Sequence, residues 1–209
     1  MAYEYDVFIS YKRGGTKDLW LSTIFRPYFE EYLQDRLEGR RPRIFVDKTG
    51  LTTGADWSDE IIYALAHSKC LVAIISPSYF MSSEWCIKEF LTIKYRQQRL
   101  DLKAGSVPPS LMWLIAIQEF ENVPPIIHTV QFANYIKYNV VGDAFFRSNE
   151  FLDFQRECRN DVKTVANIIR NAPPWQEEWD TQAWKDEIKR SIDEYFSHYN
   201  EPKQGFLSW

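Results

Sequence analysis

A carboxylate and an aromatic ring four positions apart, Glu89 and Trp85, form the pair in this sequence that is best placed to do chemistry. Residues four apart share one face of a helix, and Ser82 or Ser83 can cap a helix that begins near Glu84. A glutamate with an ordinary pKa of about 4.3 is ionised at neutral pH. It can therefore stabilise a positive charge that develops in a neighbouring ligand.

Each of these residues also has a plainer explanation. Glu89 could be a solvated helix carboxylate paired with Lys88 or Arg96, and a tryptophan at the start of a helix often fills the core. Cys86 lies beside the pair, but no histidine nearby in the sequence would activate it as a nucleophile.

Several other chemistries lack their sequence patterns. Gly14-Gly15 is not the dinucleotide-binding pattern G-x-G-x-x-G, and neither a P-loop nor the nucleophile elbow G-x-S-x-G occurs. His67, His128 and His198 are isolated, without the spacing of metal ligands. Hydride transfer, P-loop phosphoryl transfer and zinc catalysis are therefore disfavoured, and we expect no metal.

The composition indicates one globular unit. The chain has 209 residues, 45% of them hydrophobic, and a net charge of −4, so bulk attraction to nucleic acid or anionic membranes is not expected. The longest apolar run, residues 70–75, is too short to cross a bilayer, and the first residues do not resemble a signal peptide. Three scattered cysteines fit reduced thiols, so we expect a cytoplasmic protein.

Short β-rich runs alternate with longer helical stretches, as is typical of a parallel sheet covered by helices. Strands are expected at residues 5–11, 43–46, 70–75, 112–117 and 126–132. A helical stripe runs from Phe25 to Leu37, with Pro27 starting or kinking it. Further helices are expected around residues 61–65, from residue 84, over 150–170, and after Pro173-Pro174. We expect a domain over residues 1–172 and a helical extension over residues 173–209 that packs on it.

Open parallel sheets bind ligands outside the carboxyl ends of their strands, where the strand order reverses. In the common order 2-1-3-4-5, that place lies between the loops after the first and third strands. Here those loops are residues 12–18 and 76–83, and the glycine-containing loop that begins at Asp47 lies alongside.

Four sequence boxes in these regions carry a family resemblance. They are Tyr5-Asp6-Val7-Phe8-Ile9-Ser10-Tyr11, Phe45-Val46-Asp47, Ser76-Pro77-Ser78-Tyr79 and Ser83-Glu84-Trp85-Cys86-Ile87-Lys88-Glu89-Phe90. In this order, over about residues 3–100, they resemble the Toll/interleukin-1 receptor (TIR) domain family. The resemblance implies a flavodoxin-like α/β fold with a five-stranded parallel sheet of order 2-1-3-4-5, here with an extra C-terminal helix.

The resemblance implies one of two activities. Many TIR domains of animals are adaptors that bind other TIR domains. Many TIR domains from bacteria and plants, and those that act in axon degeneration, cleave NAD. The cleaving members release nicotinamide and either ADP-ribose or a cyclic isomer, and their essential glutamate would be Glu89 here. A free-standing chain resembles bacterial antiphage signalling enzymes of the Thoeris type, whose product a downstream effector senses. NAD would be the substrate, with no separate cofactor and with self-association between TIR chains.

The same resemblance assigns the remaining site residues. Trp85 would stack beside the nicotinamide ribose, and Lys12 and Arg13 would face the diphosphate, while Asp47 would shape or contact the site. The substrate-binding set is completed by Ser10, Tyr11 and Ser83. The plainer alternatives are a solvated loop for Lys12 and Arg13 and a turn-capping role for Asp47.

Two rival functions stay open. One is a non-enzymatic TIR–TIR adaptor whose loop around Gly50 and Gly54 docks on another TIR domain. The other is a related nucleoside glycosyl-transfer enzyme. An adaptor has no need of a carboxylate at Glu89, which favours the enzyme.

Overall fold

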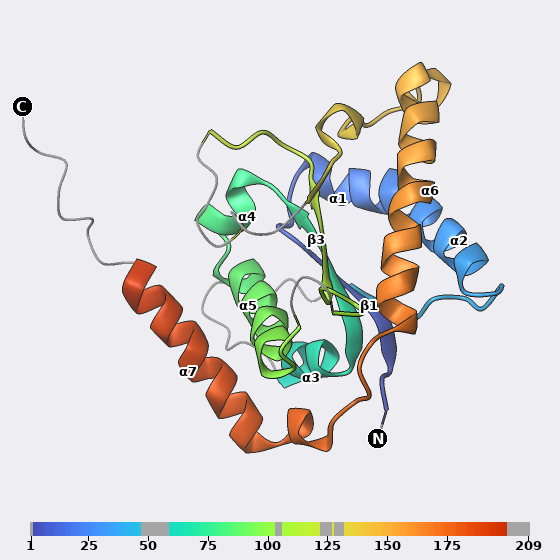
Figure 1. The fold of residues 1–209 in the computed structure, drawn as a ribbon. Coiled ribbons are helices and arrows are strands. Elements are labelled where there is room, and N and C mark those ends of the chain that lie inside the picture. The colour runs from blue at the N-terminus through green and yellow to red at the C-terminus, as the bar shows by residue number, and fades with distance from the viewer. Residues whose placement is uncertain (1, 47–58, 103–105, 122–126, 128–131, 200–209) are drawn as a thin grey trace, which may run out of the picture.

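A computed structural model describes residues 2–46, 59–102, 106–121, 127 and 132–199. Five parallel strands form one sheet in the order β2-β1-β3-β4-β5, as predicted (Figure 1). The strands are β1 (Tyr5–Tyr11), β2 (Ile44–Val46), β3 (Ser68–Ile75), β4 (Met112–Ala116) and β5 (Phe132–Asn134). Strand β3 is buried along nearly its whole length, because strands pair with it on both sides and helices cover both faces.

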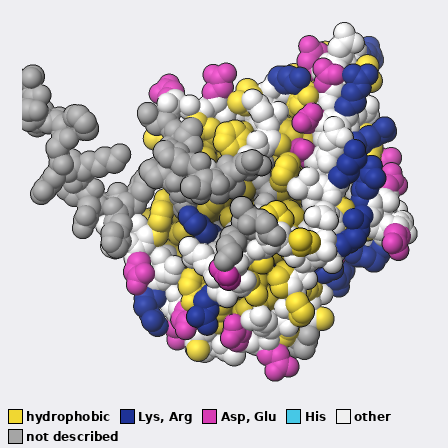
Figure 2. All heavy atoms as spheres, in the orientation of Figure 1, with side chains coloured by type: hydrophobic (Ala, Val, Ile, Leu, Met, Phe, Trp, Pro, Cys, Tyr) yellow, Lys and Arg dark blue, Asp and Glu magenta, His cyan; other side chains and the backbone are white. Residues whose placement is uncertain are grey.

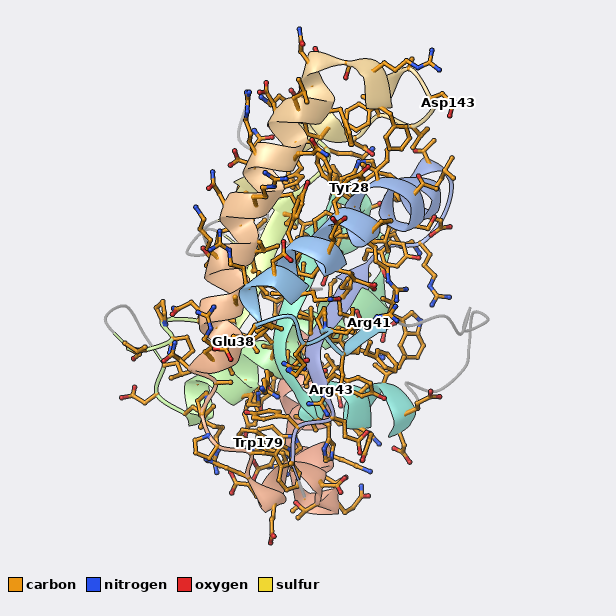
Figure 3. All side chains as sticks on the ribbon, turned by 90° about the vertical axis from the view of Figure 1, so that its right-hand side faces the viewer. Tyr28, Glu38, Arg41, Arg43, Asp143 and Trp179 are labelled. Carbon is orange, nitrogen blue, oxygen red and sulfur yellow. The ribbon has the colours of Figure 1, made fainter. Side chains whose placement is uncertain are left out.

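Two layers of helices cover the sheet. On one face lie α3 (Asp59–Ala66) and α5 (Glu84–Arg99), with α7 (Gln182–Tyr199) packed outside α5. The other face carries α2 (Arg26–Arg36) and α6 (Asn149–Arg170), which pack against each other. Figure 3 places Tyr28 between these two helices, where its ring meets Phe151 and Phe154 with centroids 5.2 and 5.9 Å away.

The chain between β1 and α2 is more helical than predicted. We expected a polar loop over residues 12–18, but α1 (Thr16–Trp20) begins there and runs through the π-helical segment η1 (Leu21–Phe25) into α2. Gly14 and Gly15 have φ angles of 117° and 65°, values that favour glycine. Pro27 lies in the first turn of α2. It lacks an N–H donor, so it makes no backbone hydrogen bond to the preceding turn.

Other expected elements are found with small shifts at their ends. The helix expected after the third strand begins at Glu84 with Ser83 as its N-cap. A short helix, α4 (Pro77–Met81), precedes it within the loop expected over residues 76–83. Of the expected strand at residues 126–132, only residues 127 and 132 are described, and β5 continues from there to Asn134.

The segment after α6 closes the α3–α5 face. The 3-10 turn η5 (Glu177–Asp180) brings Trp179 into full burial, and Tyr95 of α5 donates a hydrogen bond to Glu187 of α7 at 2.6 Å. The division at residue 172 stays a prediction. No helix in the described part of the chain is long and apolar enough to cross a membrane.

Lys and Arg side chains gather along the edge formed by α6 (Figure 2). Arg156, Arg159, Lys163 and Arg170 are exposed on that helix, although the chain carries a net charge of −4. These cations share the helix with the acidic residues Glu150, Asp153 and Glu157.

Candidate functional site

The Glu89 side chain points from α5 to the carboxyl end of β1. Its Oε2 atom accepts a hydrogen bond of 2.5 Å from the Ser10 hydroxyl, which is also 2.7 Å from the Tyr79 hydroxyl of α4. Glu89 is only 5% exposed. The interpretation of Glu89 as a solvated surface carboxylate is therefore wrong.

The two cations that could have paired with Glu89 are engaged elsewhere. Lys88 forms an ion pair of 2.5 Å with Glu84. The Arg96 guanidinium is buried and donates to backbone carbonyls at the end of α3 and the start of β3, at 2.8–3.3 Å. A surface ion pair does not explain why a glutamate occupies position 89.

Cys86 lies in the same buried cluster. Its thiol accepts a hydrogen bond from Ser83 at 3.0 Å, and the Ser83 hydroxyl caps the helix by accepting from the Cys86 N–H at 3.4 Å. Burial, and next the negative charge of Glu89, raise the pKa of the Cys86 thiol well above its ordinary value of 9.0. The thiol is thus protonated at neutral pH, as expected for a cysteine that no neighbouring histidine activates as a nucleophile.

Lys12 contributes positive charge to this cluster. Its ammonium acts on the Cys86 thiol and offsets part of the rise in the thiol's pKa, so Lys12 lies on the Glu89 side of the strand end. A second cation, Lys17 of α1, donates to the Ser78 hydroxyl at 3.2 Å. This bond joins the segments after β1 and β3, the two that were predicted to border the site.

Trp85 is half-buried at the first turn of α5. The Lys88 ammonium lies 5.0 Å from the centre of its ring. A ligand that stacks on Trp85 would therefore use the face of the ring that Lys88 leaves open.

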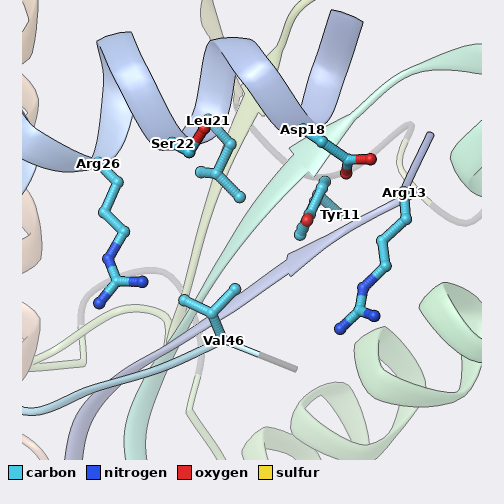
Figure 4. A pocket seen from close by; sticks show the side chains of 7 residues that line it. All are labelled: Tyr11, Arg13, Asp18, Leu21, Ser22, Arg26 and Val46. Carbon is cyan, nitrogen blue, oxygen red and sulfur yellow. The ribbon is translucent and has the colours of Figure 1, made fainter. Parts of the chain in front are cut away.

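Tyr11 and Arg13 lie on the other side of β1. Side chains alternate along a strand, so Ser10 meets α5 whereas Tyr11 faces η1. Figure 4 shows the result, a hollow of about 300 Å³ at the ends of β1 and β2. It is lined by Tyr11, Arg13, Asp18, Leu21, Ser22, Arg26 and Val46.

The structure thus divides the predicted site residues into two groups that meet at the end of β1. Ser10, Lys12, Ser83 and Glu89 lie on the α5 side, with Trp85 on the same helix, and Tyr11 and Arg13 lie on the η1 side. Asp47, Gly50, Gly54 and Trp57 lie outside the described residues. A ligand that contacts both groups of residues must extend across the carboxyl end of β1.

Two residues near the candidate site, Tyr79 and Arg26, were not among the predicted site residues. Tyr79 was quoted only as part of a sequence box, although its place after β3, the neighbour of β1, could have indicated contact with Ser10. Arg26 reaches the hollow from α2, and no local pattern signals that. In the described part of the chain, no three His, Cys, Asp or Glu side chains could together hold a metal ion.

The chain matches one family model and is distantly similar to solved structures that include two TIR-domain structures. Residues 7–111 match the family model described as TIR domain. The TIR domain of the Toll-related receptor TRR-2 from Hydra magnipapillata is 18% identical, with a TM-score of 0.41, over 75% of this chain and 99% of that one. The TIR domains of the activated Roq1 resistosome, which directly recognises the pathogen effector XopQ, are 19% identical, with a TM-score of 0.37, over 94% and 99%.

Proposed function

The chain belongs to the TIR domain family, and we propose that it is an enzyme that cleaves NAD between nicotinamide and ribose. The observation that carries this proposal is a buried glutamate, Glu89, whose carboxylate is held at the carboxyl end of β1 by a hydrogen bond from Ser10. An interaction module gains nothing from burying a carboxylate there, because burying a charge costs free energy.

Cleavage of the bond between nicotinamide and ribose requires only one carboxylate. The bond between C1′ of the ribose and the pyridinium nitrogen breaks, and its electron pair goes to the ring, so nicotinamide leaves as a neutral molecule without needing a proton. The positive charge passes to the ribose, where Glu89 stabilises it by its field and by contact with the sugar hydroxyls. Water then attacks C1′ and loses a proton to give ADP-ribose, or a nucleophile of the same molecule closes a cyclic isomer.

The hollow beside β1 suits the other half of the substrate. Arg13 and Arg26 lie at its two ends (Figure 4), and guanidinium groups recognise phosphate oxygens well. We assign the diphosphate to this side of the strand, with Lys12 near the ribose. Asp18 also lines the hollow, so two positively charged side chains and one negatively charged side chain face it.

Access to Glu89 is limited in a single chain. At 5% exposure, the carboxylate can contact a ribose only if neighbouring side chains give way. We propose that association with a second TIR chain favours this opening, so that turnover per chain rises with protein concentration. The product would act as a second messenger for a downstream immune effector.

The test compares NAD cleavage by the wild type and by Glu89→Gln at equal concentration, with nicotinamide followed by chromatography. Loss of the charge should slow release by at least about 100-fold, while the thermal unfolding midpoint stays close to that of the wild type. Glu84→Gln is the matched control, because Glu84 lies on the same helix, is exposed and pairs with Lys88. It should cleave NAD at the wild-type rate.

The same experiment separates the rivals. No nicotinamide from the wild type, even when it is concentrated enough to self-associate, would favour the adaptor. Equal rates for the wild type and Glu89→Gln would remove Glu89 from the mechanism. Faster consumption of nucleosides than of NAD would point to a nucleoside glycosyl-transfer enzyme.

A further inference from the structure

Three buried side chains from three different elements form a hydrogen-bonded chain that ends on Glu89. The Tyr79 hydroxyl of α4 lies 2.7 Å from the Ser10 hydroxyl of β1, which lies 2.5 Å from Oε2 of Glu89 on α5. We propose that Tyr79 and Ser10 are positioning residues, which hold the Glu89 carboxylate in one orientation and favour its charged form. The role in catalysis rests on the proposed function, whereas the effect on the charge of Glu89 does not.

The chemistry of the groups fixes the direction of the chain. An ionised carboxylate only accepts hydrogen bonds, and a serine hydroxyl has one proton to donate. Ser10 therefore gives its proton to Glu89 and accepts the bond from Tyr79. This leaves the Ser10 hydroxyl without a proton for a substrate, so Ser10 supports Glu89 instead of binding the substrate itself.

Tyr79 remains a donor throughout the physiological pH range. Burial, followed by the charges of Cys86 and Glu89, raises the pKa of its phenol well above 10.0. Tyr79 and Ser10 are both almost completely buried, so water does not compete for either bond. Hydrogen bonds in such a setting are stronger than in water and polarise one another.

Three other titratable groups belong to the segments around Glu89. Cys86 from α5 is neutral at physiological pH because of its raised pKa, and Tyr79 from α4 is neutral too. Lys12, after β1, brings a positive charge close to Cys86. The Cys86 thiol stays neutral over the pH range in which carboxyl groups titrate, so its own charge does not contribute to a shift of the Glu89 titration in Tyr79→Phe or Ser10→Ala.

The direct test follows the titration of Glu89 by carbon NMR in protein labelled with ¹³C at the glutamate carboxyl. The Glu89 signal is identified by its loss in Glu89→Gln. Removing a hydrogen bond to a charged group disfavours that group, so Tyr79→Phe and Ser10→Ala should each move the midpoint up by about one pH unit. A midpoint that moves by less than about 0.2 units in both variants would overturn the proposal.

Two matched variants control for general disturbance. Tyr95→Phe removes a phenol on α5, the helix that carries Glu89. This phenol also donates a hydrogen bond to a glutamate, Glu187 of α7. Ser68→Ala removes a buried serine hydroxyl from a strand, where it donates to the Ala64 carbonyl at 2.6 Å. Neither variant should move the Glu89 midpoint. A shift as large as in Tyr79→Phe would mean that Glu89 responds to any loss of packing, and would overturn the proposal.

Kinetics add the readout that links position to activity. In Tyr79→Phe we expect kcat for NAD to fall about 10-fold with KM within twofold, and the acid limb of the kcat profile to move up with the NMR midpoint. Unchanged kcat in both variants, with Glu89→Gln inactive, would overturn the positioning role while leaving the proposed function intact. A wild type without activity would overturn the proposed function, and the NMR titration would still decide whether the chain sets the charge of Glu89.

Discussion

Glu89 and Asp161 both carry buried carboxyl groups, but the surroundings of the two groups differ. Glu89 accepts a hydrogen bond from Ser10. Asp161 of α6 faces Tyr135 and Trp113, yet burial prevails over their donor groups and raises its pKa from 3.8 to about 6. Because the pKa of Asp161 is raised, its negative charge at neutral pH destabilises the folded state. The proposed mechanism does not use Asp161.

Replacing Asp161 by Asn should therefore stabilise the protein at pH 7.5, by about 1–2 kcal/mol. The folded-state pKa of Asp161 is raised, so its contribution to stability is fully present below about pH 4 and is lost as the pH rises through about 6. The advantage of Asp161→Asn should accordingly shrink toward pH 4.5. Urea unfolding at pH 4.5, 6 and 7.5 measures it, and an advantage that is constant across this range would contradict the assignment.

Local patterns indicated Glu89 but not its partners. Glu89 follows a helix start that the serines and Glu84 mark in the sequence, and Ser10 ends a clearly alternating strand. Tyr79 was missed because its role depends on a contact across 69 positions, which only the sheet order creates. The same holds for Arg26, which reaches the hollow from the next helix.

At the scale of elements, β1 is fixed to its neighbours by Asp6. This buried carboxylate accepts hydrogen bonds from the Arg40 guanidinium at 2.7 and 3.0 Å and from the Arg43 N–H at 2.9 Å. The Lys69 ammonium lies 3.5 Å away. Burial alone would raise the pKa of Asp6, but the bonds from Arg40 and Arg43 and the nearby positive charges lower it overall. Asp6 thus ties β1 to the segment before β2 and to β3.

Asp6→Asn should cost about 2 kcal/mol of unfolding free energy at pH 7, because bonds between charged groups are lost. The pKa of Asp6 is lowered in the folded state, so its contribution is present above the ordinary carboxyl pKa and is lost as the pH falls through the lowered value. Urea unfolding should show the variant and the wild type converging as the pH falls below the ordinary carboxyl pKa of 3.8. Asp153→Asn, which breaks an exposed pair with Arg156, is the control and should change stability by less than about 0.5 kcal/mol.

The start of the helical region between β1 and β2 was not predicted from the sequence. The stripe from Phe25 to Leu37 was found, but the helix already begins at Thr16. The π-helical turn η1 shifts the spacing of Trp20, Leu21 and Ile24 relative to the later stripe, so one period does not fit both parts. A pattern search with a fixed period of 3.6 residues reads the first part as a loop.

At the scale of the whole molecule, residues 173–199 complete the α3–α5 face. The Arg96 guanidinium lies 4.9 Å from the ring of Trp179, and the Tyr3 hydroxyl donates to the Pro173 carbonyl at 2.8 Å. Figure 3 shows Trp179 at the lower end of the molecule. The C-terminal segment therefore covers a buried cation on the same helix that carries Glu89, and we propose that it unfolds together with the rest of the domain.

Trp179→Ala should destabilise the protein by about 3–5 kcal/mol, since it empties a fully buried site and uncovers Arg96. Thermal unfolding should still show one transition, at a lower midpoint. Phe146→Ala is the control, because Phe146 is 38% exposed and should cost much less. A chain of residues 1–172 that unfolds at the wild-type midpoint would show instead that the extension is independent.

The architecture was largely predictable, because strand and helix periods and the order of the sequence boxes all agree with one sheet. The packing of the C-terminal segment was predicted only in outline. Its contacts with Tyr3, His67 and Arg96 join the two ends of the chain, and no short-range pattern records them. His67, which appeared isolated in the sequence, is buried between the rings of Tyr63 and Trp175.

The most direct test of the central claim is a proton NMR time course of NAD with concentrated wild type and, separately, with Glu89→Gln. The account predicts that the wild type converts the nicotinamide signals of NAD to those of free nicotinamide while a new anomeric signal of the ribose appears. With Glu89→Gln, NAD should persist at least about 100 times longer. Unchanged NAD with the wild type, or equal conversion by both proteins, would contradict the account.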